Sequence, residues 1–216
     1  MSNINAIILD LGGVLLNLDF QKTENAFVKL GISHFSQLFS QQHASQLFTD
    51  LETGKVSPEE FIWTLRKESG KDVTDQQITD AWNAMLLDFP PERIALLKRL
   101  KGHYPLFLLS NTNAIHLPAF NQKLKEEYGI SSLDELFDKA YYSHLIRERK
   151  PDLAAYQVVI QENNLHPATT LFVDDNQENI EGAGKAGLYA VHLKASQPVN
   201  ELMEKILAGP KWLRGC

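Results

Sequence analysis

Residues 7–15 read Ile7-Ile8-Leu9-Asp10-Leu11-Gly12-Gly13-Val14-Leu15, an apolar run that ends in one carboxylate and a pair of glycines. A strand that is apolar at every position is typical of a parallel sheet covered on both faces. Such a strand delivers Asp10 to its C-terminal end, a suitable place for a nucleophile or a metal ligand. The glycine pair lets the backbone approach a ligand closely or adopt a positive φ. On this segment alone, a carboxylate that only caps the following turn is the alternative.

Similar apolar runs recur along the chain, and segments with helical spacing separate them, such as the one that carries Ile94, Leu97 and Leu100. This alternation predicts the α/β class, with a Rossmann-like parallel sheet in a three-layer α/β/α core. Sheets of this kind bind ligands beyond the carboxyl ends of their strands. The predicted strands are residues 5–9, 106–109, 140–142, 170–173 and 188–193.

The connection between the first two strands is far longer than an ordinary loop, and its patterns are helical. Ser57-Pro58-Glu59-Glu60 and Thr74-Asp75-Gln76-Gln77 both have the form of a capping box at a helix start. The sequence therefore predicts an inserted helical-bundle cap over residues 17–88. Residues 1–16 and 89–216 would form the core.

Composition limits the partners. The 216 residues carry a net charge of −6 without a compensating Lys/Arg cluster, which argues against nucleic acid as a partner. No apolar run is long enough to cross a membrane, and no N-terminal signal is evident. One cysteine, Cys216, excludes an internal disulfide framework and a cysteine zinc cluster. We expect a cytoplasmic soluble protein, and the sequence carries no signal of its oligomeric state.

Three more polar segments follow predicted strands. Ser110-Asn111-Thr112-Asn113 offers a hydroxyl and backbone N–H groups at a strand-to-helix turn, which is a ready anion cradle. Lys150-Pro151 places a positive charge before a helix that the proline is expected to begin. Asp174-Asp175 joins two acids that repel each other unless a cation or a proton compensates, and oxygen ligands suit Mg²⁺. A turn, a solvated lysine and a helix cap are the respective structural alternatives.

These four segments, in this order and each after a strand, resemble the four signatures of the haloacid dehalogenase (HAD) superfamily of hydrolases. The helical insert lies where one HAD subclass carries its cap. Asp-Leu-Gly-Gly-Val, Ser-Asn-Thr-Asn and Asp-Asp-Asn-x-x-Asn-Ile-x-Gly-Ala further resemble the branch near sugar-1-phosphate phosphatases and the phosphatase domain of epoxide hydrolases.

The resemblance implies a phosphatase in which Asp10 attacks phosphorus and forms an aspartyl-phosphate. It implies Mg²⁺ bound by Asp10, by Asp175 and by the backbone carbonyl of Gly12. Asp174 would orient metal-bound water or Lys150, although the two adjacent acids could exchange roles. The substrate is expected to be a small phosphorylated metabolite, such as a sugar 1-phosphate. Its phosphoryl group would be bound by Ser110, Asn111 and Lys150.

Gly12 departs from the family pattern, because it replaces the second aspartate of the first signature. In the family that aspartate protonates the leaving oxygen and later activates water. A group of this kind contributes on the order of 10²–10⁴-fold in rate. Without it, alkyl phosphates should react poorly, whereas anomeric phosphates, acyl phosphates and anhydrides lose less. A substrate hydroxyl, a water or a cap side chain could substitute, with His34 and His43 as cap candidates.

Two other functions fit part of the pattern. A haloacid dehalogenase needs neither a metal nor an acid for its leaving halide, but it should lack the Asp174-Asp175 pair. A HAD-fold binding protein without catalysis would also explain Gly12, yet the other signature positions are intact. Arg147 and Arg149 are left open, as residues that either assist phosphate binding or face solvent.

Overall fold

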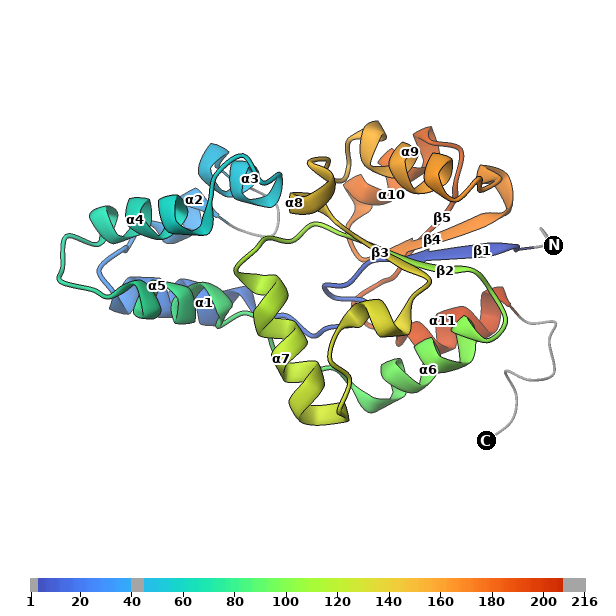
Figure 1. Cartoon of the computed structure of the whole chain (residues 1–216), viewed down its shortest axis with the longest axis horizontal. Coiled ribbons are helices and arrows are strands. Elements are labelled where there is room, and N and C mark those ends of the chain that lie inside the picture. The colour runs from blue at the N-terminus through green and yellow to red at the C-terminus, as the bar shows by residue number, and fades with distance from the viewer. Residues whose placement is uncertain (1–3, 40–44, 208–216) are drawn as a thin grey trace.

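The computed structural model describes residues 4–39 and 45–207. Within these ranges, five parallel strands form one sheet in the order β3-β2-β1-β4-β5 (Figure 1). Each strand end lies within one residue of its predicted position, so the α/β prediction is confirmed. His43 and Cys216 lie outside the described residues. The strands are β1 (Ala6–Leu9), β2 (Leu106–Ser110), β3 (Lys139–Tyr142), β4 (Thr170–Asp174) and β5 (Tyr189–His192).

Alternate residues of β1 face two different cores, which is why the whole strand is apolar. Ile8 packs in one cluster with α9 (Leu153–Glu162) and α10 (Gln177–Lys185). Ile7 and Leu9 pack in the other cluster with α6 (Pro91–Lys101) and α11 (Val199–Ile206). Figure 1 shows these two pairs of helices on opposite faces of the sheet. A strand covered on both sides leaves only its carboxyl end free for polar side chains.

The named elements in the described part of the predicted insert are all helices, and they lie at the end of the molecule away from α6 and α11 (Figure 1). The Thr74 capping box is present, because the Thr74 hydroxyl accepts from Gln77 N at 3.2 Å and Gln77 Oε1 accepts from Thr74 N at 2.8 Å. Ser57 accepts from Glu60 N at 3.2 Å. The division into a core and a cap at residues 16 and 89 stays a prediction. The helices are α1 (Phe20–Lys29), α2 (Phe35–Leu38), α3 (Gln46–Glu52), α4 (Pro58–Ser69) and α5 (Asp75–Asn83).

The chain enters and leaves this group of helices through two segments that pair with each other. Asn17 N donates to Asp88 O at 3.0 Å, and Leu87 N donates to Asn17 O at 2.9 Å. The Asn17 side chain also donates to Asp88 Oδ1 at 3.2 Å. The two chain connections between this group and the sheet therefore lie side by side, close to the carboxyl end of β1.

One local prediction is wrong. Pro151 does not begin a helix, because Asp152 N donates to Arg149 O at 3.0 Å and closes a turn that contains Lys150 and Pro151. Helix α9 begins only at Leu153. The remaining elements are α7 (His116–Tyr128), α8 (Ser143–Ile146) and the 3₁₀ helices η1 (Leu133–Leu136) and η2 (Pro167–Thr169).

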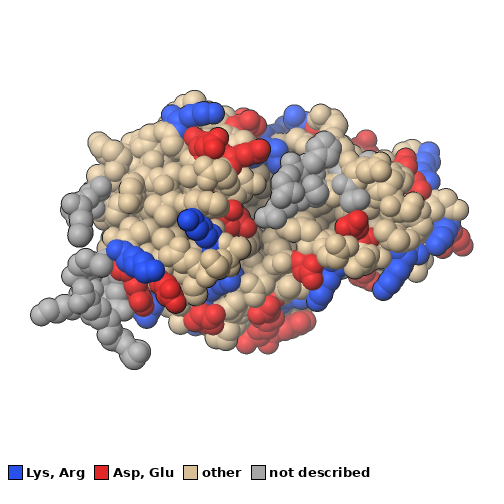
Figure 2. All heavy atoms as spheres, turned by 180° about the vertical axis from the view of Figure 1, so that it is seen from behind, with Lys and Arg blue, Asp and Glu red and all other residues tan. Residues whose placement is uncertain are grey.

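Charged side chains of both signs are interspersed on the face shown in Figure 2, and no continuous basic band crosses it. Among the residues that the structure describes, no helix has the length and apolar character needed to cross a membrane.

Helix α10 can approach the turn before α9 because residue 182 is glycine. A Cβ at this position would lie 2.4 Å from Pro151 O and 3.0 Å from the Tyr156 ring. We expect Gly182→Ala to destabilise the protein by about 1–3 kcal/mol, since backbone cannot move aside as a side chain can. Gly184→Ala, on the exposed side of the same helix with nothing within 4 Å, should stabilise by about 0.5–1 kcal/mol. Urea unfolding measures the change in the free energy of unfolding for both variants. Equal changes for Gly182→Ala and Gly184→Ala would contradict the close packing at Gly182.

Candidate active site

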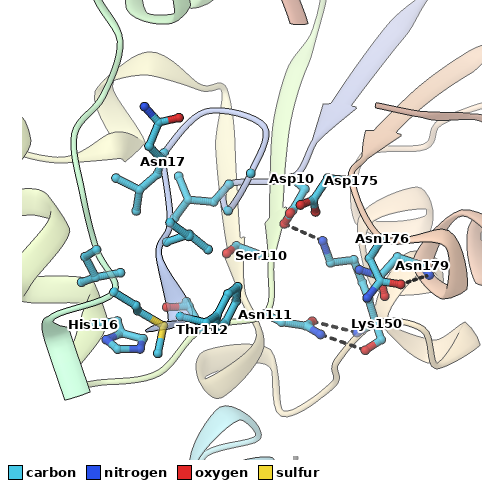
Figure 3. A pocket seen from close by; sticks show the side chains of 18 of the residues that line it. Asp10, Asn17, Ser110, Asn111, Thr112, His116, Lys150, Asp175, Asn176 and Asn179 are labelled. Carbon is cyan, nitrogen blue, oxygen red and sulfur yellow. Dashed lines mark hydrogen bonds and ion pairs between the residues drawn. The ribbon is translucent and has the colours of Figure 1, made fainter. Parts of the chain in front are cut away.

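The predicted functional residues meet at the carboxyl edge of the sheet. Asp10 directly follows β1, Ser110 ends β2 and Asp174 ends β4. Because these three strands are neighbours in the sheet, their ends lie side by side. Figure 3 shows the side chains of Asp10, Ser110 and Lys150 around one cavity, with Asp175 beside Asp10.

Lys150 is the buried cation of this edge. Its Nζ lies 2.6 Å from Asp10 Oδ1 and 2.6 Å from Asp174 Oδ2, and the residue is 1% exposed. Burial disfavours the ammonium form, but the two carboxylates outweigh this effect and raise the pKa of Lys150. The turn that contains Lys150 thus supplies the positive charge that compensates Asp10 after β1 and Asp174 at the end of β4.

Asn111 holds the backbone of Lys150. Its side-chain amide donates to Lys150 O at 2.8 Å, and its side-chain oxygen accepts from Lys150 N at 2.9 Å. The carboxamide is therefore engaged with the chain itself (Figure 3). Direct contact between Asn111 and a substrate stays a prediction, whereas the contact that positions Lys150 is present.

The two adjacent acids have different surroundings. Asp174 is fully buried, and both of its oxygens are bound: Asn176 N donates at 2.8 Å and the Asn179 amide at 3.1 Å, besides the lysine. Asp175 instead lines the cavity and lies against Gly13. A Cβ at Gly13 would come within 2.1 Å of Asp175 Oδ2, and its φ is +69°, so this position requires glycine.

Asp10, Asp174 and Asp175 offer carboxylate oxygens that all lie within 4.8 Å of one another. Burial is the largest cause that raises the pKa of Asp10, to about 8; Lys150 opposes it, and the other two acids add to it. Burial and Asp174 likewise raise the pKa of Asp175, to about 6. Three acids lie close to the single ammonium of Lys150, and their all-oxygen donor set fits a hard divalent ion.

The cavity above these residues has a volume of about 710 Å³. The carboxylates, Ser110 and Lys150 form one end of it. The opposite wall is formed by aromatic and aliphatic side chains from the inserted helices and the segments that flank them. These are Leu18, Phe20, Phe39, Trp82, Met85 and Leu86. The cavity thus joins a charged end to an apolar wall, as ligand sites commonly do.

The structure also places residues in the cavity whose roles the sequence left open or did not indicate. Arg149 is paired with Glu52 of α3, with Nη2–Oε2 and Nε–Oε2 distances of 2.9 and 3.0 Å. Burial raises the pKa of Glu52, and Arg149 opposes that shift. His116 also lines the cavity, whereas His34 lies 3.6 Å from Glu68 at the surface and Arg147 does not line the cavity. Linear patterns do not show such pairs, because 97 residues separate Glu52 from Arg149.

A sequence profile of haloacid dehalogenase-like hydrolases matches residues 4–187. The chain belongs to this family. The match covers β1 to β4 and the helices between them, so the resemblance seen in the four signatures is confirmed. The chain is therefore a member of a family of hydrolases, and its carboxyl-edge cluster lies where the family signatures meet.

Relatives make the family placement more specific. D-ribitol-5-phosphate phosphatase of Bacteroides thetaiotaomicron is 30% identical over 82% of this chain and 85% of its own length. Sesquiterpene phosphatase of Aspergillus oryzae is 28% identical over 90% of this chain and 92% of its own. A HAD family enzyme from B. thetaiotaomicron, solved with magnesium and inorganic phosphate, superposes with a TM-score of 0.81 at 32% identity, covering 92% of this chain and 98% of its own.

Removing the buried cation should be costly. Lys150→Met leaves Asp10 and Asp174 without their counter-charge, and we expect a loss of about 3–5 kcal/mol in the free energy of unfolding at pH 7. The loss should shrink at pH 5, because without the ammonium the carboxylates take up protons in the folded state, and folding then gains stability as the pH falls.

Urea unfolding at both pH values measures this effect. Lys139→Met is the matched control, since Lys139 is exposed and pairs with Glu162 at the surface. It should change stability little at either pH. A Lys150→Met variant as stable as the control would contradict the assignment of Lys150 as the cation of the cluster.

Proposed function

We propose that this chain is a Mg²⁺-dependent phosphatase of a small phosphorylated metabolite. The observation that carries the proposal is the cluster of Asp10, Lys150 and Asp175 at the charged end of the cavity. Phosphatase relatives, and a similar enzyme solved with magnesium and phosphate, support it. The paired acids Asp174 and Asp175 favour phosphoryl chemistry over dehalogenation, which needs no metal.

Asp10 is the proposed nucleophile. A carboxylate oxygen of Asp10 forms a bond to phosphorus while the bond from phosphorus to the leaving oxygen breaks, which yields an aspartyl-phosphate and an alkoxide or its equivalent. Water then attacks this phosphorus, releases inorganic phosphate and restores Asp10. Oδ1 of Asp10 pairs with Lys150, and among the described residues the second oxygen accepts no hydrogen bond. That oxygen is the one free to react.

Asp10, Asp175 and the backbone carbonyl of Gly12 would bind Mg²⁺. When bound, the ion compensates the negative charge of the carboxylates and of the phosphoryl group. Asp174 orients Lys150, because its oxygens are already occupied by Lys150, Asn176 and Asn179. Ser110 and Lys150 would bind the phosphoryl oxygens. Asn111 contributes by holding the turn that carries Lys150.

Gly12 restricts the leaving group. A Cβ added at Gly12 would lie 2.7 Å from Leu18 Cδ1, at the flexible end of the leucine side chain. Leu18 therefore fills the space that an acidic side chain at position 12 would occupy. Leaving groups that need no protonation, such as acyl or anomeric oxygens, should therefore be released most readily. A sugar 1-phosphate fits this restriction.

The nucleophile is tested by Asp10→Asn. An amide cannot attack phosphorus, so we expect turnover of acetyl phosphate with Mg²⁺ to fall by more than about 10³-fold. Asp19→Asn is the matched control, because Asp19 caps α1 and asparagine caps equally well. It should retain activity. Phosphate release measures both variants, and Asp10→Asn with wild-type activity would disprove the mechanism.

The leaving-group restriction is tested with two substrates. We expect the wild type to have a kcat/KM for acetyl phosphate about 10²–10⁴-fold above that for pentyl phosphate, since only the latter needs an acid. Gly12→Asp introduces an acid, and Leu18→Ala makes space for its side chain. The double variant should reduce the ratio of the two kcat/KM values, and Leu18→Ala alone should leave the ratio unchanged. Equal wild-type values for the two substrates would mean that another group supplies the proton.

A further inference from the structure

His116 is a polar residue in the part of the cavity wall that is otherwise mainly apolar. It begins α7, on the connection that follows Ser110, and is 6% exposed. The Asn113 side chain accepts from His116 N at 3.0 Å and so fixes the first turn of the helix. Figure 3 shows the imidazole ring at the edge of the cavity, on the side away from Asp10 and Asp175.

The surroundings of His116 determine its tautomer. Nδ1 lies 2.8 Å from Asn83 Oδ1, and a carboxamide oxygen can only accept a hydrogen bond, so Nδ1 carries the proton. Burial lowers the pKa of His116 to about 3, and the ring is therefore neutral. Nε2 is then an acceptor without a proton. Among the described residues, no group donates to it.

The inserted helices hold this ring in place. Trp82 stacks on the imidazole with a centroid distance of 4.6 Å and an interplanar angle of 22°. Trp82 and Asn83 are neighbours in α5, so one helix sets both the plane and the tautomer of His116. An acceptor fixed in this way is suited to recognising one donor group of a ligand.

We propose that His116 Nε2 accepts a hydrogen bond from a hydroxyl of the substrate, and so selects hydroxylated phosphates over apolar ones at this wall of the cavity. This inference rests on the proposed phosphatase function and specifies its substrate. The hydroxyl groups of such a substrate would lie between the end of the cavity that carries Asp10 and Asp175 and the wall formed by Trp82 and Met85.

Recognition is the role that fits this residue. A neutral histidine that is hard to protonate cannot give a proton to the leaving oxygen, so His116 does not replace the aspartate that Gly12 lacks. An apolar substrate would cover Nε2 without offering a donor, and an unpaired buried acceptor is unfavourable. A site built to bond a hydroxyl thus discriminates against the analogue without it.

The experiment compares three phosphates with Mg²⁺. D-Ribitol 5-phosphate and pentyl phosphate share the chain length and the type of leaving oxygen but differ in hydroxyls, and acetyl phosphate reports the chemistry at Asp10 alone. We expect the wild type to prefer ribitol 5-phosphate over pentyl phosphate in kcat/KM. His116→Phe should lower that preference about tenfold, mainly through KM.

Two more variants separate recognition from folding. His116→Asn keeps an amide that can donate to Asn83 but lacks an acceptor at the Nε2 position, so it should lose the preference as His116→Phe does. His116→Gln places an oxygen near that position and should restore part of the preference. His34→Phe, at the surface beside Glu68, is the matched control and should behave as the wild type.

Each outcome decides the proposal. A wild type that does not prefer ribitol 5-phosphate, or a preference that survives in both His116→Phe and His116→Asn, would overturn it. If His116→Phe does not fold, His116→Asn alone decides. Failure of the wild type on all three phosphates, acetyl phosphate included, would instead overturn the phosphatase function on which the inference rests.

Discussion

The bridge that Lys150 forms between Asp10 and Asp174 is the interaction on which the site depends. Three groups that would each be unfavourable alone are buried together, from two strand ends and one turn. The bridge places the ends of β1 and β4 at a set distance from the turn before α9. Asn176 and Asn179 donate to the oxygens of Asp174, and Asn111 holds the backbone of Lys150, so Asp174 and Lys150 have little freedom to move.

Asp10 and Asp175 line the cavity, whereas Asp174, the other acid that Lys150 binds, does not. Asp174 has no exposed surface, whereas Asp175 borders the cavity and is approached by the backbone of Gly13. The adjacent acids therefore divide into one that holds the lysine and one that faces a ligand. The two acids also differ in position, because Asp174 is the last residue of β4 and Asp175 lies outside the strand.

The inserted helices contribute the other side of the cavity. They supply its apolar wall, the ion pair from Glu52 to Arg149, and the ring and amide that orient His116. Arg149 and Lys150 are neighbours, so the turn that carries Lys150 is also in contact with α3. A shift of the helices relative to the sheet would change the surroundings of both residues at once.

The sequence by itself determined the sheet, the family signatures and the residues at the strand ends. Apolar runs such as residues 7–9 identify buried strands because each residue faces one of two cores, and parallel strands bring their carboxyl ends to one edge. The sequence also predicted the capping box at Thr74, because a capping box involves only residues close in the chain.

Only the tertiary structure decided which acid faces the cavity, what Asn111 binds, where α9 begins and that Glu52 and His116 belong to the site. Apart from the start of α9, each of these depends on contacts between residues far apart in the chain, such as 97 residues for Glu52 and Arg149 and 33 for Asn83 and His116. A linear pattern records the periodicity of a helix or strand but not the partner that its side chains meet. That partner is set by packing, in which the whole chain takes part.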